Sequence, residues 1–224
     1  MSNSIILLSG GLDSIVTLAY SQKHTDYNVN LALTFDYGQK AIENEIEASK
    51  KVCEYYGVKH EIIKLDWLKN ITKSSLVAEK GVPDSNKKHN LKDLWIPNRN
   101  GLFLNIAACY CDSFNYNYIL YGANKEEAEV FLDNTETFRA QISKTFETST
   151  LVQPKVIAPL INYTKSDIVK IAVEDSVPLE FVRSCYKQGN KHCGKCDSCV
   201  YLKKALQANN CEYYIDILFE NDEN

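Results

Sequence analysis

The sequence predicts an α/β fold: a doubly wound parallel sheet of five strands with a C-terminal zinc-binding segment. Short apolar or β-branched runs alternate with helical patterns along the chain, as in a parallel sheet covered by helices. The chain has 224 residues, 45% of them hydrophobic and 24% charged, which suits a core of ordinary size. We expect the α/β domain over residues 1–180 and the zinc-binding segment over residues 181–224, packed on the same domain.

Five runs of strand length predict the sheet: residues 4–8, 30–35, 60–65, 118–121 and 156–160. Residues 41–56 predict a helix that places one set of side chains on one face: Ile42, Ile46, Ser49, Val52 and Tyr56. Residues 102–111 are apolar nearly all round, which predicts a buried helix, and Cys53, Cys109 and Cys111 are expected in the core. Ligands of such sheets bind beyond the carboxyl ends of the strands.

A Ser-Gly-Gly turn follows the first strand. Ser9, Gly10 and Gly11 precede Asp13 and Ser14, which open a helical pattern; strand, glycine loop and helix form the layout of a phosphate-binding site. Glycines permit a close backbone approach, serine hydroxyls add donors, and the helix dipole adds about half a positive charge. No Lys follows the glycines, so this is not the GxxxxGK[ST] loop. The alternative is a plain turn in which Asp13 caps the helix.

This string resembles the SGGxDS pyrophosphate loop of the N-type ATP pyrophosphatases, and within them the chain most resembles the 7-cyano-7-deazaguanine synthases of queuosine biosynthesis. The resemblance implies an adenine nucleotide alpha hydrolase-like fold and an ATP-dependent carbon–nitrogen ligase, working as a homodimer with Mg²⁺ and ATP. The reaction implied converts 7-carboxy-7-deazaguanine and ammonia to 7-cyano-7-deazaguanine through adenylate and amide intermediates. It implies these ATP-binding residues: Leu8, Ser9, Gly10, Gly11, Leu12, Asp13, Ser14, Tyr37 and Gln39.

Two further stretches carry the resemblance. Residues 35–39 read Phe-Asp-Tyr-Gly-Gln after the second strand, where the family has an FDYGQ string beside the nucleotide or substrate. By themselves these residues predict only a strand-to-helix turn. Residues 96–101 resemble the family's PxRN string, and the planar guanidinium of Arg99 suits a carboxylate or phosphate. The resemblance places Arg99 and Asn100 at the active-site cleft, with Asn124 a further substrate-binding candidate.

The chain departs from the family after residue 130. The family has a Tyr-Pro-Asp-Cys-Arg-like segment that contacts the deazaguanine acid, whereas residues 131–135 read Phe-Leu-Asp-Asn-Thr. Asp133 aligns with the family's Asp and is expected to bind substrate, but Asn134 and Thr135 replace the Cys and Arg. The alternative function is therefore a related deazapurine-activating enzyme that modifies a protein or nucleic acid partner. Glu136 and Arg139 are expected to pair on a helix surface.

Lys165 lies in the first turn of a predicted helix. Thr164 and Asp167 have the spacing of a capping box with Asp in place of Glu, whereas a Lys in the first turn repels the helix dipole. The resemblance implies that Lys165 contacts the ATP phosphates. We therefore expect Asp13, Lys165 and Arg99 to be the catalytic residues, with Asp13 offering an oxygen ligand to Mg²⁺.

Four cysteines near the C-terminus are arranged as C-x7-C-x2-C-x2-C: Cys185, Cys193, Cys196 and Cys199. Four thiolates at this spacing can surround Zn²⁺ tetrahedrally. Disulfides and an iron–sulfur cluster are the alternatives, and the family resemblance favours structural zinc. His192 adjoins the cluster and is expected to stand beside the ligands.

The composition limits the partners. Lys and Arg total 25 against 29 Asp and Glu, a formal net charge of −4, which disfavours a nucleic-acid surface and favours a small-molecule substrate. No apolar run is long enough for a signal or membrane segment, so we expect a cytoplasmic protein. Residues 66–95 have weak periodicity and predict a mobile lid; His89 within it is given no role.

Overall fold

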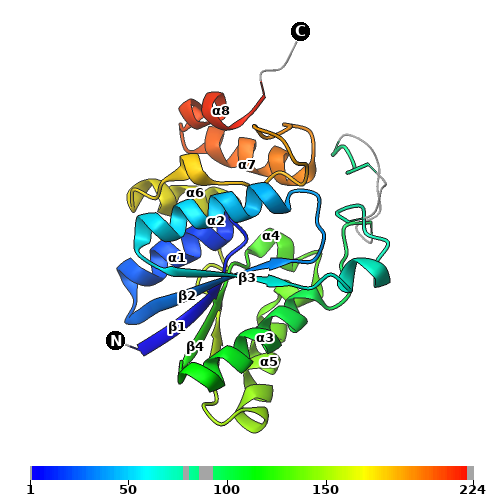
Figure 1. Cartoon of the computed structure of the whole chain (residues 1–224). Helices are drawn as coiled ribbons and strands as arrows, with labels where there is room; N and C mark the ends of the chain where they lie inside the picture. Colours follow the sequence, from blue (N-terminus) through cyan, green and yellow to red (C-terminus); the bar gives the residue numbers. More distant parts are fainter. Residues whose placement is uncertain (1, 78–80, 86–92, 221–224) are drawn as a thin grey trace.

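The central sheet has five parallel strands in the order β3-β2-β1-β4-β5 (Figure 1). In the computed structural model, which describes residues 2–77, 81–85 and 93–220, the strands are β1 (Ser2–Leu7), β2 (Tyr27–Asp36), β3 (Lys59–Lys64), β4 (Tyr118–Tyr121) and β5 (Lys155–Ile157). The strand order reverses at β1, so a crevice opens between the carboxyl ends of β1 and β4. The predicted α/β fold with a doubly wound five-stranded sheet is confirmed.

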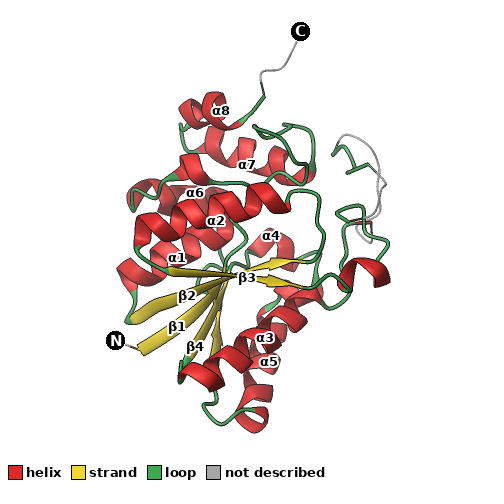
Figure 2. Cartoon of the chain, viewed as in Figure 1, coloured by secondary structure: helices red, strands yellow, loops and turns green. Residues whose placement is uncertain are grey.

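Helices cover both faces of the sheet (Figures 1 and 2). One face carries α1 (Leu12–His24), α2 (Ile42–Tyr56) and α6 (Lys165–Glu174); the other carries α3 (Arg99–Phe114) and α5 (Glu136–Ser149). Shorter elements complete the described chain: η1 (Leu68–Ile71), α4 (Lys125–Ala128), η3 (Leu132–Asn134), η4 (Leu179–Phe181), α7 (Asp197–Ala208) and α8 (Glu212–Leu218). None of the helices in the described ranges has the length and apolar character needed to cross a bilayer.

Burial follows this layering. Ile5 and Ile6 of β1 point to opposite faces and are both fully buried, because a central strand between two helical layers has no solvent face. The face of α2 predicted from periodicity is also correct, since Ser49 and Val52 are fully buried against the sheet.

Helix α3 differs from its prediction. Leu104, Ala107 and Cys111 are buried, but Cys109 is exposed, so its predicted core position was wrong. The physical reason is that α3 covers only one face of the sheet and turns its other side to solvent. Its apolar composition alone therefore overstated its burial.

The C-terminal segment packs over α6 (Figure 1). Leu202 and Leu206 of α7 and Phe219 after α8 belong to the same hydrophobic cluster as Leu12 of α1. Residues 181–224 therefore pack on the α/β domain through this shared hydrophobic cluster. The boundary at residue 180 stays a prediction.

The predicted lid is described only in part. Leu68, Leu76 and Leu94 are buried in the cluster beneath β2 and α3. Residues 78–80 and 86–92, which include His89, lie outside the described residues. The mobility of residues 66–95 stays a prediction.

Candidate functional site

The loop between β1 and α1 lies directly on α2. Gly10 has φ +73°, and a Cβ there would come within 2.8 Å of both Ala48 Cβ and Glu45 O. Only glycine permits this conformation together with this approach. Gly10 therefore packs against α2, whereas Gly11 lines the neighbouring cavity.

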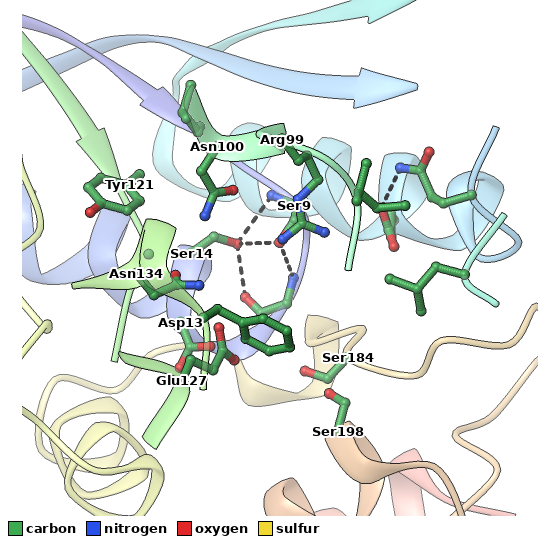
Figure 3. A pocket seen from close by; sticks show the side chains of 18 of the residues that line it. Ser9, Asp13, Ser14, Arg99, Asn100, Tyr121, Glu127, Asn134, Ser184 and Ser198 are labelled. Atoms are coloured by element: carbon green, nitrogen blue, oxygen red, sulfur yellow. Dashed lines mark hydrogen bonds between the residues drawn. The ribbon is translucent and has the colours of Figure 1, made fainter. Parts of the chain in front are cut away.

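Serine hydroxyls organise the loop (Figure 3). Ser9 Oγ accepts from the Gly11 amide at 3.3 Å and lies 3.2 Å from Ser14 Oγ. Ser14 Oγ accepts from the Ser9 amide at 3.2 Å and donates to Gly11 O at 3.0 Å. The result is a cluster of hydroxyls and amides at the N-terminus of α1, where the helix dipole favours an anion.

The end of β4 closes the loop from the other side. Gly122 follows the strand, and a Cβ there would lie 2.7 Å from Ser14 N and 2.8 Å from Asp13 C. The absence of a side chain at Gly122 thus allows the carboxyl ends of β1 and β4 to meet at the point where the strand order reverses.

A Lys between two carboxylates lies beside the loop. Lys165 Nζ donates to Asp13 Oδ2 and lies 3.1 Å from Glu127 Oε1. The Asp13 and Lys165 side chains are each 14% exposed, whereas Glu127 is 38% exposed. The backbone amide of Lys165 donates to the Glu126 carboxylate at 2.9 Å. These contacts bring together α1, α4 and α6.

Asp13, Lys165 and Glu127 shift one another's pKa values through their charges. Burial alone would lower the pKa of Lys165, but Asp13 and Glu127 raise it well above its usual range, so the ammonium stays charged. Burial, reinforced by Glu127 and opposed by Lys165, raises the pKa of Asp13. Burial raises the pKa of Glu127, but the charge and hydrogen bond of Lys165, together with Asn124 and Arg99, lower it overall.

Asp13 also has an oxygen available for a cation. Its Oδ1 is buried and has no hydrogen-bond partner in the structure, although Asn124 lies near enough to lower the pKa of Asp13. Carboxylate oxygens are the ligands that Mg²⁺ prefers. The site therefore fits a divalent cation that accompanies phosphate.

A second group lies at the N-terminus of α3. Arg99 Nη1 donates to Tyr37 Oη at 3.3 Å. Asp133 Oδ2 accepts from the Asn100 amide at 3.4 Å, and Asn100 Nδ2 donates to Asp133 O at 3.3 Å. Burial raises the pKa of Asp133, while the positive charge of Arg99 opposes the shift. Arg99, Asn100 and Asp133 thus form one polar wall of the site.

A cavity of about 550 Å³ joins the two groups, a size typical of small-molecule sites. Most residues predicted for ATP and substrate line it: Leu8, Ser9, Gly11, Leu12, Asp13, Ser14, Tyr37, Gln39, Arg99, Asn100, Asp133 and Lys165. Trp95 and Phe131 also line it, with ring centroids 6.1 Å apart and planes inclined by 18°. The two rings are stacked on one another and add an aromatic surface to the cavity.

Two predicted contact residues, Asn124 and Gln39, also have structural partners, and their ligand contacts stay predictions. Asn124 Oδ1 accepts from the Glu127 amide at 2.9 Å and caps α4. Like Gly10, Asn124 is not among the residues that line the cavity. Gln39 does line it, but its side chain is bonded to Tyr37 N, Phe35 O and Glu45 Oε2 and so supports the turn after β2.

Other lining residues were missed from the sequence. Glu45, Glu127, Arg183, Ser184 and Ser198 all face the cavity. Ser184 and Ser198 adjoin the cysteine motif, which was the one available signal. The carboxylates that line the cavity outnumber the cations: Asp13, Glu45, Glu126, Glu127, Asp133 and Asp197 against Arg99, Lys165 and Arg183. A triphosphate here needs a counter-cation.

The four predicted metal ligands are close together. The Sγ atoms of Cys185, Cys193, Cys196 and Cys199 all lie within 4.8 Å of one another, and the Cys193–Cys199 separation is 3.9 Å. A tetrahedron with zinc–sulfur bonds of about 2.3 Å has edges of about 3.8 Å. The cluster can therefore hold a metal ion, and four thiolates suit zinc.

His192 lies next to the cluster in the sequence, and both of its ring nitrogens have hydrogen-bond partners. Its Nε2 accepts from the Ser184 amide at 2.9 Å, and its Nδ1 lies 3.1 Å from Leu218 O. Burial lowers the pKa of His192 to about 4, so the ring is neutral, with Nδ1 carrying the proton. This arrangement agrees with the prediction that His192 is not a ligand.

The family model "Queuosine biosynthesis protein QueC" matches residues 3–210. The chain is similar to the 7-cyano-7-deazaguanine synthase of Carboxydothermus hydrogenoformans, with 45% identity over 93% of the chain and 100% of that protein. It is also similar to the synthase of Methanosarcina barkeri, with 42% identity over 91% of the chain and 93% of that protein.

Solved structures share the fold. An NMN synthetase from Francisella tularensis matches with a TM-score of 0.51 and 14% identity, over 99% of this chain and 79% of that one. A 4-thiouridine synthetase, solved with RNA and ATP, matches with a TM-score of 0.54 and 20% identity, over 96% of this chain and 52% of that one. At these identities the likeness concerns the fold alone.

Proposed function

The chain belongs to the family of the queuosine biosynthesis protein QueC, and from this we propose that it converts 7-carboxy-7-deazaguanine and ammonia to 7-cyano-7-deazaguanine at the expense of ATP. The observation that carries the proposal is that one cavity contains both groups of residues. Both the anion-binding loop with Asp13 and Lys165 and the polar group of Arg99, Asn100 and Asp133 line it. The first group suits a phosphate chain and the second a planar acid.

Bond changes follow from these two halves. An oxygen of the substrate carboxylate attacks the α-phosphorus of ATP, and pyrophosphate leaves. Ammonia then attacks the acyl carbon, AMP leaves, and the amide forms. A second activation on the amide oxygen, followed by loss of AMP and protons, gives the nitrile. Both activations release pyrophosphate, so the charge that the loop must stabilise is the same in each.

The chain's residues have separate tasks in this scheme. The loop amides and the Lys165 ammonium stabilise negative charge on the leaving pyrophosphate. Asp13 would hold the Mg²⁺ that accompanies ATP, and this ion would neutralise further charge on the phosphates. Arg99 attracts the acid, and Asp133 accepts hydrogen bonds from the N–H edge of the deazaguanine ring. In each case the protein group is complementary in charge or hydrogen bonding to the part of the substrate that it contacts.

Product analysis tests the reaction. Purified protein is incubated with 7-carboxy-7-deazaguanine, ammonium and Mg·ATP, and mass spectrometry follows the amide, the nitrile and AMP. We expect the nitrile to form after the amide, with AMP as the nucleotide product. ATP consumption with the acid unchanged, or with a protein or RNA adduct, would support the deazapurine-activating alternative instead.

An Asp133→Asn variant tests the substrate side. It keeps an oxygen for the Asn100 amide but loses the negative charge, so the helix start is preserved. We expect a higher KM for the acid, by about tenfold, because one hydrogen-bonding partner of the substrate changes. The KM for ATP should stay the same. Equal changes in both would argue against Asp133 as a substrate contact.

We also propose a cytoplasmic homodimer with one structural Zn²⁺ per subunit. The support is the family resemblance and the four thiolates, which leave no open position on a tetrahedral ion. Light scattering of the purified protein tests the dimer, and elemental analysis tests the zinc.

A further inference from the structure

The metal-binding segment, residues 181–224, contacts the loop between β1 and α1 directly; we call this loop the nucleotide loop. The Arg183 amide donates to Gly10 O at 2.7 Å, and the Leu12 amide donates to Ser184 Oγ at 3.3 Å. These bonds hold the loop between α1 and residues 183–184, which lie more than 170 positions later in the chain. The loop conformation therefore depends on this contact.

The backbone of Ser184 is bonded to the region of the cysteine cluster. Its amide donates to His192 Nε2 at 2.9 Å, and Cys185, the next residue, is one of the four clustered thiols. The Cys185 sulfur in turn accepts from the Cys193 amide at 3.5 Å. Ser184 thus joins the metal cluster to the loop through one residue.

The Ser184 hydroxyl has a hydrogen to donate. Its oxygen accepts from the Leu12 amide, and a hydroxyl that accepts one bond keeps its own hydrogen for donation. Ser198, at the start of α7, lines the same cavity, and both serine side chains are labelled among its lining residues in Figure 3. Two hydroxyls and the loop amides in one cavity form a surface for an anion.

We propose that Ser184, together with Ser198 of the same cavity, binds the phosphate chain of ATP, so that the metal-binding segment is part of the nucleotide site. This rests on the proposed function for the presence of ATP. The phosphate chain is the group expected here, since Ser184 bonds the loop itself through the Leu12 amide. The metal then has a second effect besides stability: it positions a ligand-binding hydroxyl.

Calorimetric titration tests the contact. The metal-loaded protein is titrated with Mg·ATP and, separately, with 7-carboxy-7-deazaguanine, as wild type, Ser184→Ala, Ser184→Thr and Ser113→Ala. Ser113 is an exposed serine of α3 and serves as the matched control. We expect Ser184→Ala to weaken Mg·ATP binding by about tenfold and to leave binding of the acid unchanged. Ser184→Thr, which keeps the hydroxyl, should restore most of the affinity.

Zinc content and melting temperature separate this role from a structural one. Zinc content should equal the wild-type value in Ser184→Ala, and the melting temperature should fall only by the few degrees expected for loss of the single Leu12 hydrogen bond. Mg·ATP affinity equal to that of Ser113→Ala would overturn the proposal, and so would a parallel loss of ATP affinity, acid affinity and melting temperature. Ser198→Ala should weaken Mg·ATP selectively as well, and an unchanged affinity would remove Ser198 from the site. A wild-type protein that binds no Mg·ATP would instead refute the proposed function.

Discussion

Lys165 Nζ lies 3.1 Å from Glu127 Oε1 and also donates to Asp13 Oδ2, so one ammonium joins the start of α1 to α4. Two carboxylates outnumber the single cation in a largely buried site. Such a trio is electrostatically unbalanced by about one negative charge, which a metal-bound phosphate chain can offset.

Lys165→Ala should lower kcat/KM by about 100-fold to 1,000-fold, because one preorganised donor at a developing charge is worth roughly 3–4 kcal/mol. Steady-state kinetics with varied ATP measures this. Lys170→Ala is the control on the same helix: Lys170 is 67% exposed and its Nζ lies 3.9 Å from Glu174, so its removal should change neither rate nor stability by much. Comparable rates in the two variants would exclude Lys165 from catalysis.

Gly122→Ala should destabilise the protein by about 1–3 kcal/mol and weaken ATP binding, since a Cβ there would meet the backbone of Asp13 and Ser14. Thermal unfolding and nucleotide titration measure the two effects. Gly81→Ala provides the control, because no atom of the described residues lies within 4 Å of a Cβ at that position. Wild-type behaviour of Gly122→Ala would mean that the ends of β1 and β4 have room to separate.

Cys196→Ser should abolish metal binding and destabilise residues 181–224. Structural zinc contributes roughly 10–16 kcal/mol of apparent binding free energy in small sites, and the Cys196 side chain is fully buried. Elemental analysis and thermal unfolding give the readouts. The exposed Cys109 supplies the control, and Cys109→Ser should keep its metal. An iron absorption band in wild-type protein purified without air would contradict zinc.

The capping box of α6 predicts a pH-dependent contribution to stability. Asp167 Oδ2 accepts from Thr164 N at 2.9 Å and from Thr164 Oγ1 at 2.6 Å, and these bonds lower the pKa of Asp167. The ionised form is the stabilising one, so its contribution is complete above the unfolded pKa of about 3.9 and is lost as the pH falls through the lower folded value.

Asp167→Ala should therefore lower the free energy of unfolding by about 1 kcal/mol at pH 7, and the difference from wild type should shrink below about pH 4. Denaturant unfolding at several pH values measures it, with Asp216→Ala, at an exposed position of α8, as the control. A difference that grows toward low pH would contradict the cap.

The sequence by itself determined the sheet, the loop and the cysteine cluster. Alternating patterns report which face of a strand or helix is buried, and both the Ser9–Ser14 string and the four cysteines depend on short spacings. The capping box from Thr164 to Asp167 and the helix surface pair of Glu136 and Arg139 were predicted for the same reason and are present.

Only the tertiary structure decided which distant residues meet. Leu12 and Ser184, which share a hydrogen bond, are 172 positions apart, and Gly122 meets Ser14 only because β1 and β4 are neighbours in the sheet. Exposure of Cys109 depends likewise on which side of α3 faces the sheet. These contacts follow from the packing of whole elements, and no local period of the sequence encodes that packing.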